Sequence, residues 1–170
     1  GWLLLVADGM GAHVAGERAS RIAAEQVPLI YEKNAQRSPP LALLRGLEQA
    51  NTEINLRGRR QPEYLGMGTT CTTLVLVPRG ALVGHIGDSR AYRLRGTTLD
   101  QLTRDHSAVW ELESQGGLSR EQAERTVGKN VITRSMGPHA HVEVDIEGPH
   151  PVEQGDVFLP VSYTHLTLPT

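Results

Sequence analysis

The sequence predicts a domain of the α+β class, in which helices and antiparallel strands occupy separate stretches of the chain. Two segments near the start, 15–34 and 43–54, repeat apolar residues at the i, i+3, i+4 spacing of one helical face. The later segment 69–102 contains short runs rich in β-branched residues, separated by turns with Gly, Pro or Asp. Because strands and helices follow in blocks, α+β is favoured over alternating βαβ units.

An apolar strand at 2–7 opens the chain and leads through a glycine-rich turn into the first helix. Pro28 is expected to kink that helix or to shorten its final turn, because proline donates no backbone hydrogen bond. The Ser-Pro-Pro break at 38–40 then separates the first helix from the second.

Four strands are expected to form an antiparallel meander: 69–77, 81–87, 90–95 and 98–102. Two short helices should follow, one over 105–115 and one opened by a capping box at 119–122, before strands return at 142–146 and 156–159. Since only 4% of the residues are aromatic, the core between these elements must be aliphatic.

The composition excludes several classes of protein. The formal net charge is −2 and the basic residues are scattered, so neither a nucleic-acid footprint nor a polybasic membrane patch is expected. Cys71 is the single cysteine, which excludes a disulfide framework and favours a cytoplasmic location. The longest apolar run, 2–7, is too short to cross a bilayer. We therefore expect one domain whose partners include neither nucleic acid nor, through this segment, a membrane.

The first chemical signal is the turn "ADGMGAHVAG" at 7–16. A P-loop would need Gly-Lys-Ser/Thr, but the first lysine is Lys33. The glycine spacing, G-x-G-x-x-x-x-G, also differs from the dinucleotide pattern G-x-G-x-x-G. A carboxylate at a strand end, Asp8, followed by glycines that free a backbone carbonyl suits a hard divalent cation. The alternative is a turn in which Asp8 bonds its own backbone.

A second carboxylate, Asp88, lies in "GHIGDSRAY" at 84–92, at the end of another expected strand. The alternative here is again an Asx turn between two strands. Taken singly, neither motif decides between a metal site and a turn.

Three further stretches make the pattern specific: "GMGTTCTT" at 66–73, "LTRDHS" at 102–107 and "VITRSMG" at 131–137. In this order, the five stretches resemble the type 2C (PPM) family of Mg²⁺/Mn²⁺-dependent serine/threonine protein phosphatases in its bacterial form. The resemblance covers 2–159. It implies a four-layer αββα sandwich, in which two antiparallel sheets are flanked by helices and the metals lie at one end.

The resemblance also implies the chemistry. Asp8 corresponds to the catalytic carboxylate that bridges two Mg²⁺ or Mn²⁺ ions, and the Gly9 carbonyl to a ligand of one of them. Asp88 corresponds to the aspartate of a third, weakly held ion. A hydroxide bridging the two metals would hydrolyse phosphoserine or phosphothreonine on proteins. The expected partners are phosphorylated proteins, a serine/threonine kinase among them.

Two positions next to Asp8 depart from the family pattern. Met10 stands where many eukaryotic members carry a histidine proposed to protonate the leaving alkoxide, and a thioether cannot donate that proton. Ala12 replaces the usual second glycine. His13 is expected to point into the helix start rather than to act as the acid.

The other candidate residues are expected to be structural. His139 and His141 form His-x-His without an evident third zinc ligand, so an exposed position is expected. The Asp-His pair at 105–106 is expected to cap the following helix and to bond across the meander. The threonines at 69–70 are expected to be paired strand residues near the site.

The family pattern is incomplete at both ends, so 1–159 is expected to be part of a type 2C catalytic domain. The segment 160–170 departs from the pattern, contains no carboxylate and is similar to translated sequencing-adaptor sequence. Because the remaining metal carboxylates of the family fall outside this chain, the 170 residues alone are expected to be inactive. Two alternatives stay open: a non-catalytic domain of the same fold that binds a kinase or regulator, and an unrelated α+β binding domain.

Overall fold

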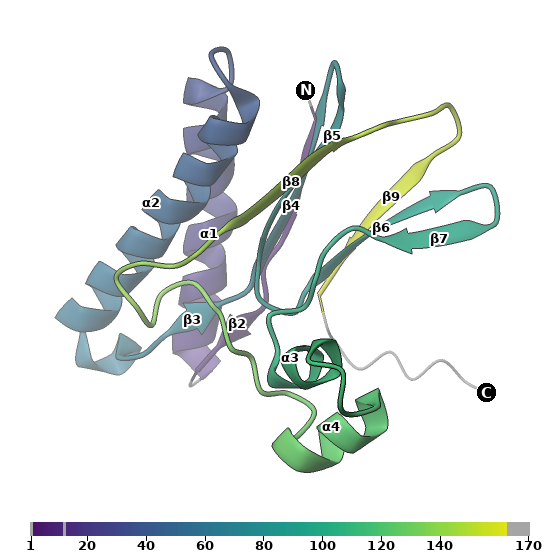
Figure 1. Cartoon of the computed structure of the whole chain (residues 1–170). Helices are drawn as coiled ribbons and strands as arrows, with labels where there is room; N and C mark the ends of the chain where they lie inside the picture. Colours follow the sequence, from purple (N-terminus) through teal and green to yellow (C-terminus); the bar gives the residue numbers. More distant parts are fainter. Residues whose placement is uncertain (1, 12, 163–170) are drawn as a thin grey trace.

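The computed structural model describes residues 2–11 and 13–162, and it has the α+β architecture that the sequence predicts (Figure 1). A four-stranded antiparallel sheet has the order β1-β4-β5-β8, and a three-stranded one has the order β7-β6-β9. The strands of the first sheet are β1 (Leu3–Val6), β4 (Cys71–Val77), β5 (Gly80–Ile86) and β8 (Asp145–His150). Those of the second are β6 (Arg90–Arg95), β7 (Thr98–Gln101) and β9 (Val157–Val161). The short strands β2 (Gly9–Met10) and β3 (Gly68–Thr69) pair with each other.

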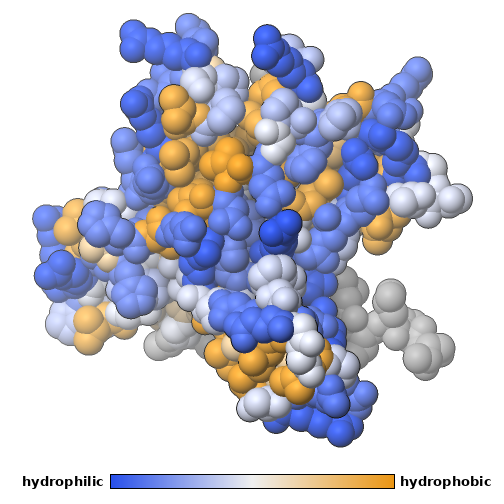
Figure 2. Space-filling model, viewed as in Figure 1, coloured by the Kyte–Doolittle hydropathy of each residue, from blue (hydrophilic) through white to orange (hydrophobic). Residues whose placement is uncertain are grey.

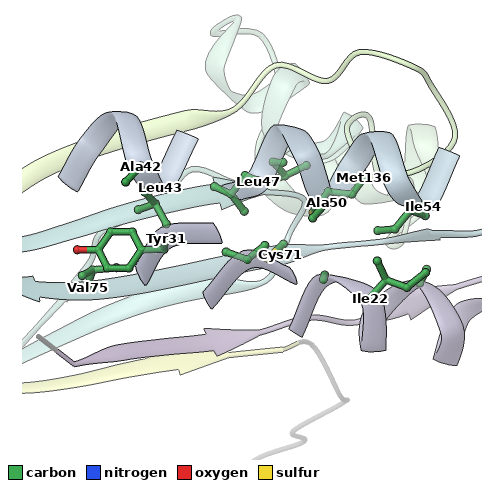
Figure 3. Packing of buried hydrophobic residues seen from close by; sticks show 14 of the residues in the cluster. Ile22, Tyr31, Ala42, Leu43, Leu47, Ala50, Ile54, Cys71, Val75 and Met136 are labelled. Atoms are coloured by element: carbon green, nitrogen blue, oxygen red, sulfur yellow. The ribbon is translucent and has the colours of Figure 1, made fainter. Parts of the chain in front are cut away.

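Two long helices, α1 (His13–Asn34) and α2 (Pro39–Arg60), pack side by side on one face of the four-stranded sheet (Figure 1). Their apolar stripes meet β4 and β5 in the main core, where Tyr31, Leu43, Leu47 and Val75 lie together (Figure 3). Of the two effects predicted for Pro28, the shortening is wrong, because α1 continues to Asn34, whereas the kink stays a prediction. Packing of the buried side chains before and after the proline stabilises this last part of the helix. Among the described helices, none is long and apolar enough to cross a membrane.

Strands β4 and β5 form the central layer because both of their faces are buried. Val75 and Leu82 belong to the core beneath the helices, whereas Leu74 and Val83 belong to a smaller core against the second sheet. This explains why both strands read as nearly continuous apolar runs rather than as alternating ones. Ala91 contributes to the smaller core from β6.

The predicted meander over 69–102 is wrong. The segment forms two separate hairpins, β4–β5 and β6–β7, which belong to different sheets. The chain passes from one sheet to the other at 87–89, where Gly87 has a φ of +111°. A left-handed conformation at this position is accessible to glycine and turns the chain away from β5. Asp88 therefore lies on the link between the two sheets.

Two short helices, α3 (Ala108–Ser114) and α4 (Arg120–Val127), lie at one end of the sheets (Figure 1). The predicted capping role of the 105–106 pair is wrong: Ser107 is the N-cap of α3, and its Oγ accepts a hydrogen bond from the Trp110 N–H at 3.2 Å. The capping box predicted at 119–122 is confirmed. A 3₁₀ turn, η1 (Pro62–Tyr64), follows α2. Figure 2 shows hydrophobic side chains over α3 and α4 on a largely hydrophilic face.

The second sheet has one covered and one open face in the described part of the chain. Its outer face carries a cluster of exposed side chains, here called the outer apolar patch: Leu94, Leu99, Val157 and Leu159. Pro160 lies in β9 at the edge of this sheet, where a missing N–H is tolerated, and the strand runs on to Val161. The expected domain boundary at 159 stays a prediction, and 163–170 lie outside the described residues.

Candidate metal centre

A pocket of about 390 Å³ lies between the links that carry Asp8 and Asp88 and the short helices α3 and α4. It brings together residues from five segments that are distant in the sequence. They are Asp8, Met10, Thr70, Asp88, Asp105, Ser107, Val109, Arg120, Glu124, Lys129, Asn130 and Ile132. The structure thus unites Asp8 and Asp88, as the sequence predicts.

The backbone of Asp8 is fixed by the two threonines that precede β4. Its N–H donates to Thr70 Oγ1 at 2.9 Å, and its carbonyl accepts from the Thr70 N–H at 2.9 Å and from Thr69 Oγ1 at 3.0 Å. Of the two threonines expected to be paired strand residues, Thr69 lies in β3, whereas Thr70 lies between β3 and β4 and lines the pocket. Within the described residues the Asp8 carboxylate makes no hydrogen bond, which disfavours an Asx turn there.

Asp88 is half-buried and has a raised pKa. Burial is the main cause, followed by the negative charge of Asp105; the charge of Asp8 adds a smaller effect. The backbone amide of Asp88 itself and the positive charge of Arg90 act in the opposite direction. The negative charges of Asp105 and Asp8 beside Asp88 form a local concentration of charge that a divalent cation would relieve.

Asp105, for which the sequence predicts only a structural role, also lines the pocket. It forms a bidentate ion pair with Arg90, whose Nε donates to Oδ1 at 2.7 Å and whose Nη2 donates to Oδ2. Arg90 also donates to the Tyr92 hydroxyl at 3.1 Å, and the pairing with Asp105 raises the pKa of the guanidinium. Both carboxylate oxygens of Asp105 are thus bound by Arg90, in contrast to those of Asp8. The two residues are 15 positions apart, and no local spacing links them.

The glycine at position 9 has a packing role. A Cβ there would lie 2.0 Å from the Gly16 carbonyl oxygen, and one on Gly16 would lie 2.8 Å from the Gly9 carbonyl carbon. Strand β2 and the first turn of α1 therefore touch backbone to backbone, which only glycine permits. This contact alone explains why residue 9 is a glycine. The role of the Gly9 carbonyl as a metal ligand therefore stays a prediction.

The other candidates fall into three groups. Met10 lines the pocket beside Asp8. His139 and His141 are exposed, as expected. Ala12 and the side chain of His13 lie outside the described residues.

Three charged residues on and just after α4 also line the pocket, and the sequence does not predict this: Arg120, Glu124 and Lys129. Glu124 on α4 pairs with Arg120, from Oε1 to Nε at 3.3 Å, and with Lys129, from Oε2 to Nζ at 3.6 Å. The only local signal in this region is the capping box, which predicts a helix and nothing about the pocket. Both cations pair with Glu124 and line the same pocket as Asp8 and Asp88.

The donors fit a hard divalent cation in kind but are few in number. Asp8 and Asp88 offer carboxylate oxygens to one pocket, the ligands that Mg²⁺ and Mn²⁺ prefer. Among the described residues there is no group of three or more His, Cys, Asp or Glu that could hold a metal ion. Cys71 is buried, and burial raises its pKa to about 12, so it offers no thiolate.

Comparisons with known proteins agree with this geometry. The family model described as protein phosphatase 2C matches residues 1–135. The chain is 35% identical over 150 residues to the serine/threonine phosphatase stp of Listeria welshimeri, an alignment covering 84% of this chain and 58% of that protein. The Mycobacterium tuberculosis serine/threonine phosphatase PstP/Ppp superposes with a TM-score of 0.81 at 31% identity, covering 93% of this chain and 66% of that one.

One solved structure bears on the metal. The catalytic domain of the serine threonine protein phosphatase PstP, determined in complex with two manganese ions, superposes with a TM-score of 0.77 at 30% identity. The match covers 93% of this chain and 65% of that one. The chain thus spans about 60% of the length of the proteins that it resembles.

Proposed function

Because the chain belongs to the protein phosphatase 2C family, we propose that the whole protein hydrolyses phosphoserine and phosphothreonine on other proteins, using Mg²⁺ or Mn²⁺ held beside Asp8. The observation that supports this most directly is one pocket lined by Asp8 and Asp88, with the Asp88 pKa raised by burial and by the neighbouring carboxylates. Phosphorylated proteins, a serine/threonine kinase among them, are the proposed partners, and the cytoplasm is the proposed location.

The residues of this chain have separable tasks in the proposed reaction. Asp8 would hold two ions, the Gly9 carbonyl would bind one of them, and Asp88 would bind a third. When bound, the ions would activate water for in-line attack on phosphorus. Thr70 holds the Asp8 backbone by accepting its N–H, so the carboxylate keeps its direction. Met10 cannot protonate the leaving alkoxide, so a water molecule at the site would supply that proton or the alkoxide would leave with less assistance.

A non-catalytic domain of the same fold, binding a kinase or regulator, is the second candidate. It would explain the small number of donors among the described residues. It would not by itself explain why Asp8 and Asp88 line one pocket, where the Asp8 carboxylate makes no hydrogen bond to the described residues.

The test is Asp8→Asn in the whole protein. We expect Mn²⁺-dependent hydrolysis of a phosphopeptide and of an aryl phosphate to be abolished, because the neutral amide removes the charge that two cations share. The matched control is Asp100→Asn, which makes the same change in β7, where Arg93 Nη2 donates to Asp100 Oδ2 at 2.7 Å. Near-normal turnover of the Asp8 variant would reject the assignment. Mn²⁺ binding by the unmodified protein without turnover on phosphopeptides would favour the non-catalytic domain.

A further inference from the structure

His106 binds the peptide that precedes Asp88 with two hydrogen bonds. Its backbone N–H donates to the Gly87 carbonyl at 2.8 Å, and the Gly87 N–H donates to its Nδ1 at 3.0 Å. The backbone N–H and carbonyl of Gly87 are thus both bound by His106, although His106 itself does not line the pocket. Its neighbours Asp105 and Ser107 do.

The partners of His106 also determine its tautomer. Because Nδ1 accepts from a backbone N–H, the ring proton of the neutral form is on Nε2. Nε2 lies 2.9 Å from Asp145 Oδ2 on β8 and 3.1 Å from Arg134 Nη1. Since a guanidinium only donates and the proton of the ring is on Nε2, Arg134 Nη1 donates instead to Asp145 Oδ1 at 2.8 Å. Burial opposes the charge on Asp145, yet the hydrogen bond from His106 and the ion pair with Arg134 lower its pKa. The His-Asp pair therefore has no nitrogen left to accept a proton from water or substrate.

On its other side, Gly87 is held by Thr70. A Cβ at Gly87 would lie 2.7 Å from Thr70 Cβ, so the two backbones are in close contact. The Thr70 hydroxyl lies 2.7 Å from Ser89 Oγ and accepts the Asp8 N–H at 2.9 Å. The link 87–89 is thus enclosed between His106 and the same threonine that holds Asp8.

We propose that His106, oriented by Asp145, is a positioning residue that fixes the Asp88 carboxylate relative to Asp8. Three motifs of the sequence, at 84–92, 102–107 and 131–137, meet in this arrangement, since they supply Gly87, His106 and Arg134. The inference rests on the proposed function only in the role that it gives Asp88 as a metal ligand.

Two carboxamide substitutions of His106 in the whole protein test the roles of its two ring nitrogens separately. His106→Asn places an oxygen near the position of Nδ1 and keeps the acceptor for Gly87. His106→Gln places an N–H near Nε2 and keeps only the donor to Asp145. Asp145→Asn retains an acceptor for Arg134 but turns an amide N–H toward His106, which favours the tautomer with the proton on Nδ1.

In the metal-free protein we expect the Gly87 amide to exchange slowly with solvent in His106→Asn, as in the unmodified protein. The exchange should be faster, and the Asp88 NMR resonances shifted, in His106→Gln and Asp145→Asn. With Mn²⁺, calorimetry should show the weakest site losing about 10- to 100-fold in affinity in the latter two variants only. The ¹⁵N shifts of the imidazole report the tautomer directly.

Equal Gly87 exchange in the Asn and Gln variants would overturn the proposal, as would an Asp88 resonance that does not move. Equal loss of thermal stability and of metal binding in all three variants would also overturn it, because it would indicate a structural role alone. If the unmodified protein neither bound Mn²⁺ nor hydrolysed phosphopeptides, the proposed function would fail, while the exchange data would still decide the role of His106.

Discussion

Met10 lines the pocket next to Asp8, and in the proposed reaction it takes the position where a proton donor would serve the leaving group. We predict that Met10→His in the whole protein is tolerated and raises kcat/KM for a phosphopeptide relative to an aryl phosphate, by at most about 10²-fold. The reason is that a serine alkoxide needs protonation, whereas a phenolate leaves without it. Steady-state kinetics on both substrates provide the measurement. An identical change on both would mean that residue 10 does not face the leaving oxygen.

His85 illustrates how burial between the sheets affects titration. Its Nε2 bonds the Arg104 carbonyl at 3.0 Å, its Nδ1 lies 2.9 Å from Thr72 Oγ1, and its ring lies 4.7 Å from that of His106. Burial, with a further contribution from the charge of His106, lowers the pKa of His85 from 6.5 to about 4. The folded protein therefore binds this proton less readily than the unfolded chain does.

The predicted consequence is a loss of stability in acid. Since the unfolded histidine gains its proton below pH 6.5 and the folded one only near pH 4, the free energy of unfolding should fall across that interval by up to about 3 kcal/mol. His85→Gln should remove this part of the pH dependence, and the exposed His139→Gln should leave it unchanged. Urea denaturation at several pH values measures the slopes; parallel slopes for His85→Gln and the unmodified chain would contradict the assignment.

At the scale of elements, the contact between β2 and α1 determines where Asp8 lies. In Gly16→Ala the new Cβ would meet the Gly9 carbonyl carbon at 2.8 Å, so the helix or the strand must move. We predict a destabilisation of about 1–3 kcal/mol by chemical denaturation, together with weaker Mn²⁺ binding in the whole protein. Glu25→Ala, on the exposed face of the same helix, is the control and should do neither. Unchanged metal affinity in Gly16→Ala would show that β2 does not position Asp8.

The elements also show what the sequence can and cannot predict. The runs that became β4 and β5 and the capping box of α4 were readable because their signals are local. The passage between the sheets at Gly87 was not, because Gly-Asp-Ser is equally typical of a hairpin turn. Which sheet a strand joins is decided by packing, here of Leu74 and Val83 against Ala91.

The same distinction holds for the site. Asp8 and Asp88 were found because each lies in a recognisable motif at a strand end. Lys129 and Arg120 were missed because they reach the pocket only through the placement of α4, for which no sequence spacing gives a signal. The pairing of Arg90 with Asp105 depends likewise on how the second hairpin folds back.

At the scale of the whole molecule, the outer apolar patch is an exposed hydrophobic surface. Leu94 pairs across the strands with Leu99 on one side and with Val157 on the other, so three apolar side chains adjoin on one face. We predict that the 170-residue chain self-associates as its concentration rises, because contiguous exposed apolar area favours contact. Sedimentation velocity should show this for the unmodified chain and less for Leu99→Lys. Leu29→Lys, on the exposed face of α1, is the matched control, and equal effects of both would exclude the patch as the cause.

The final prediction concerns metal binding by the 170 residues alone. Each Mn²⁺ ion needs several oxygen ligands, yet Asp105 is bound by Arg90, and Glu124 is paired with Arg120 and Lys129. Among the described pocket carboxylates, Asp8 and Asp88 remain outside these ion pairs. We therefore expect calorimetric titration of this chain to show no saturation below ~1 mM Mn²⁺, with little turnover of an aryl phosphate. Asp8→Asn should weaken the residual binding further, whereas Asp100→Asn should not. Micromolar binding of two ions with robust turnover would mean that donors other than carboxylates complete the site, and the pocket would then have to be reassigned around them.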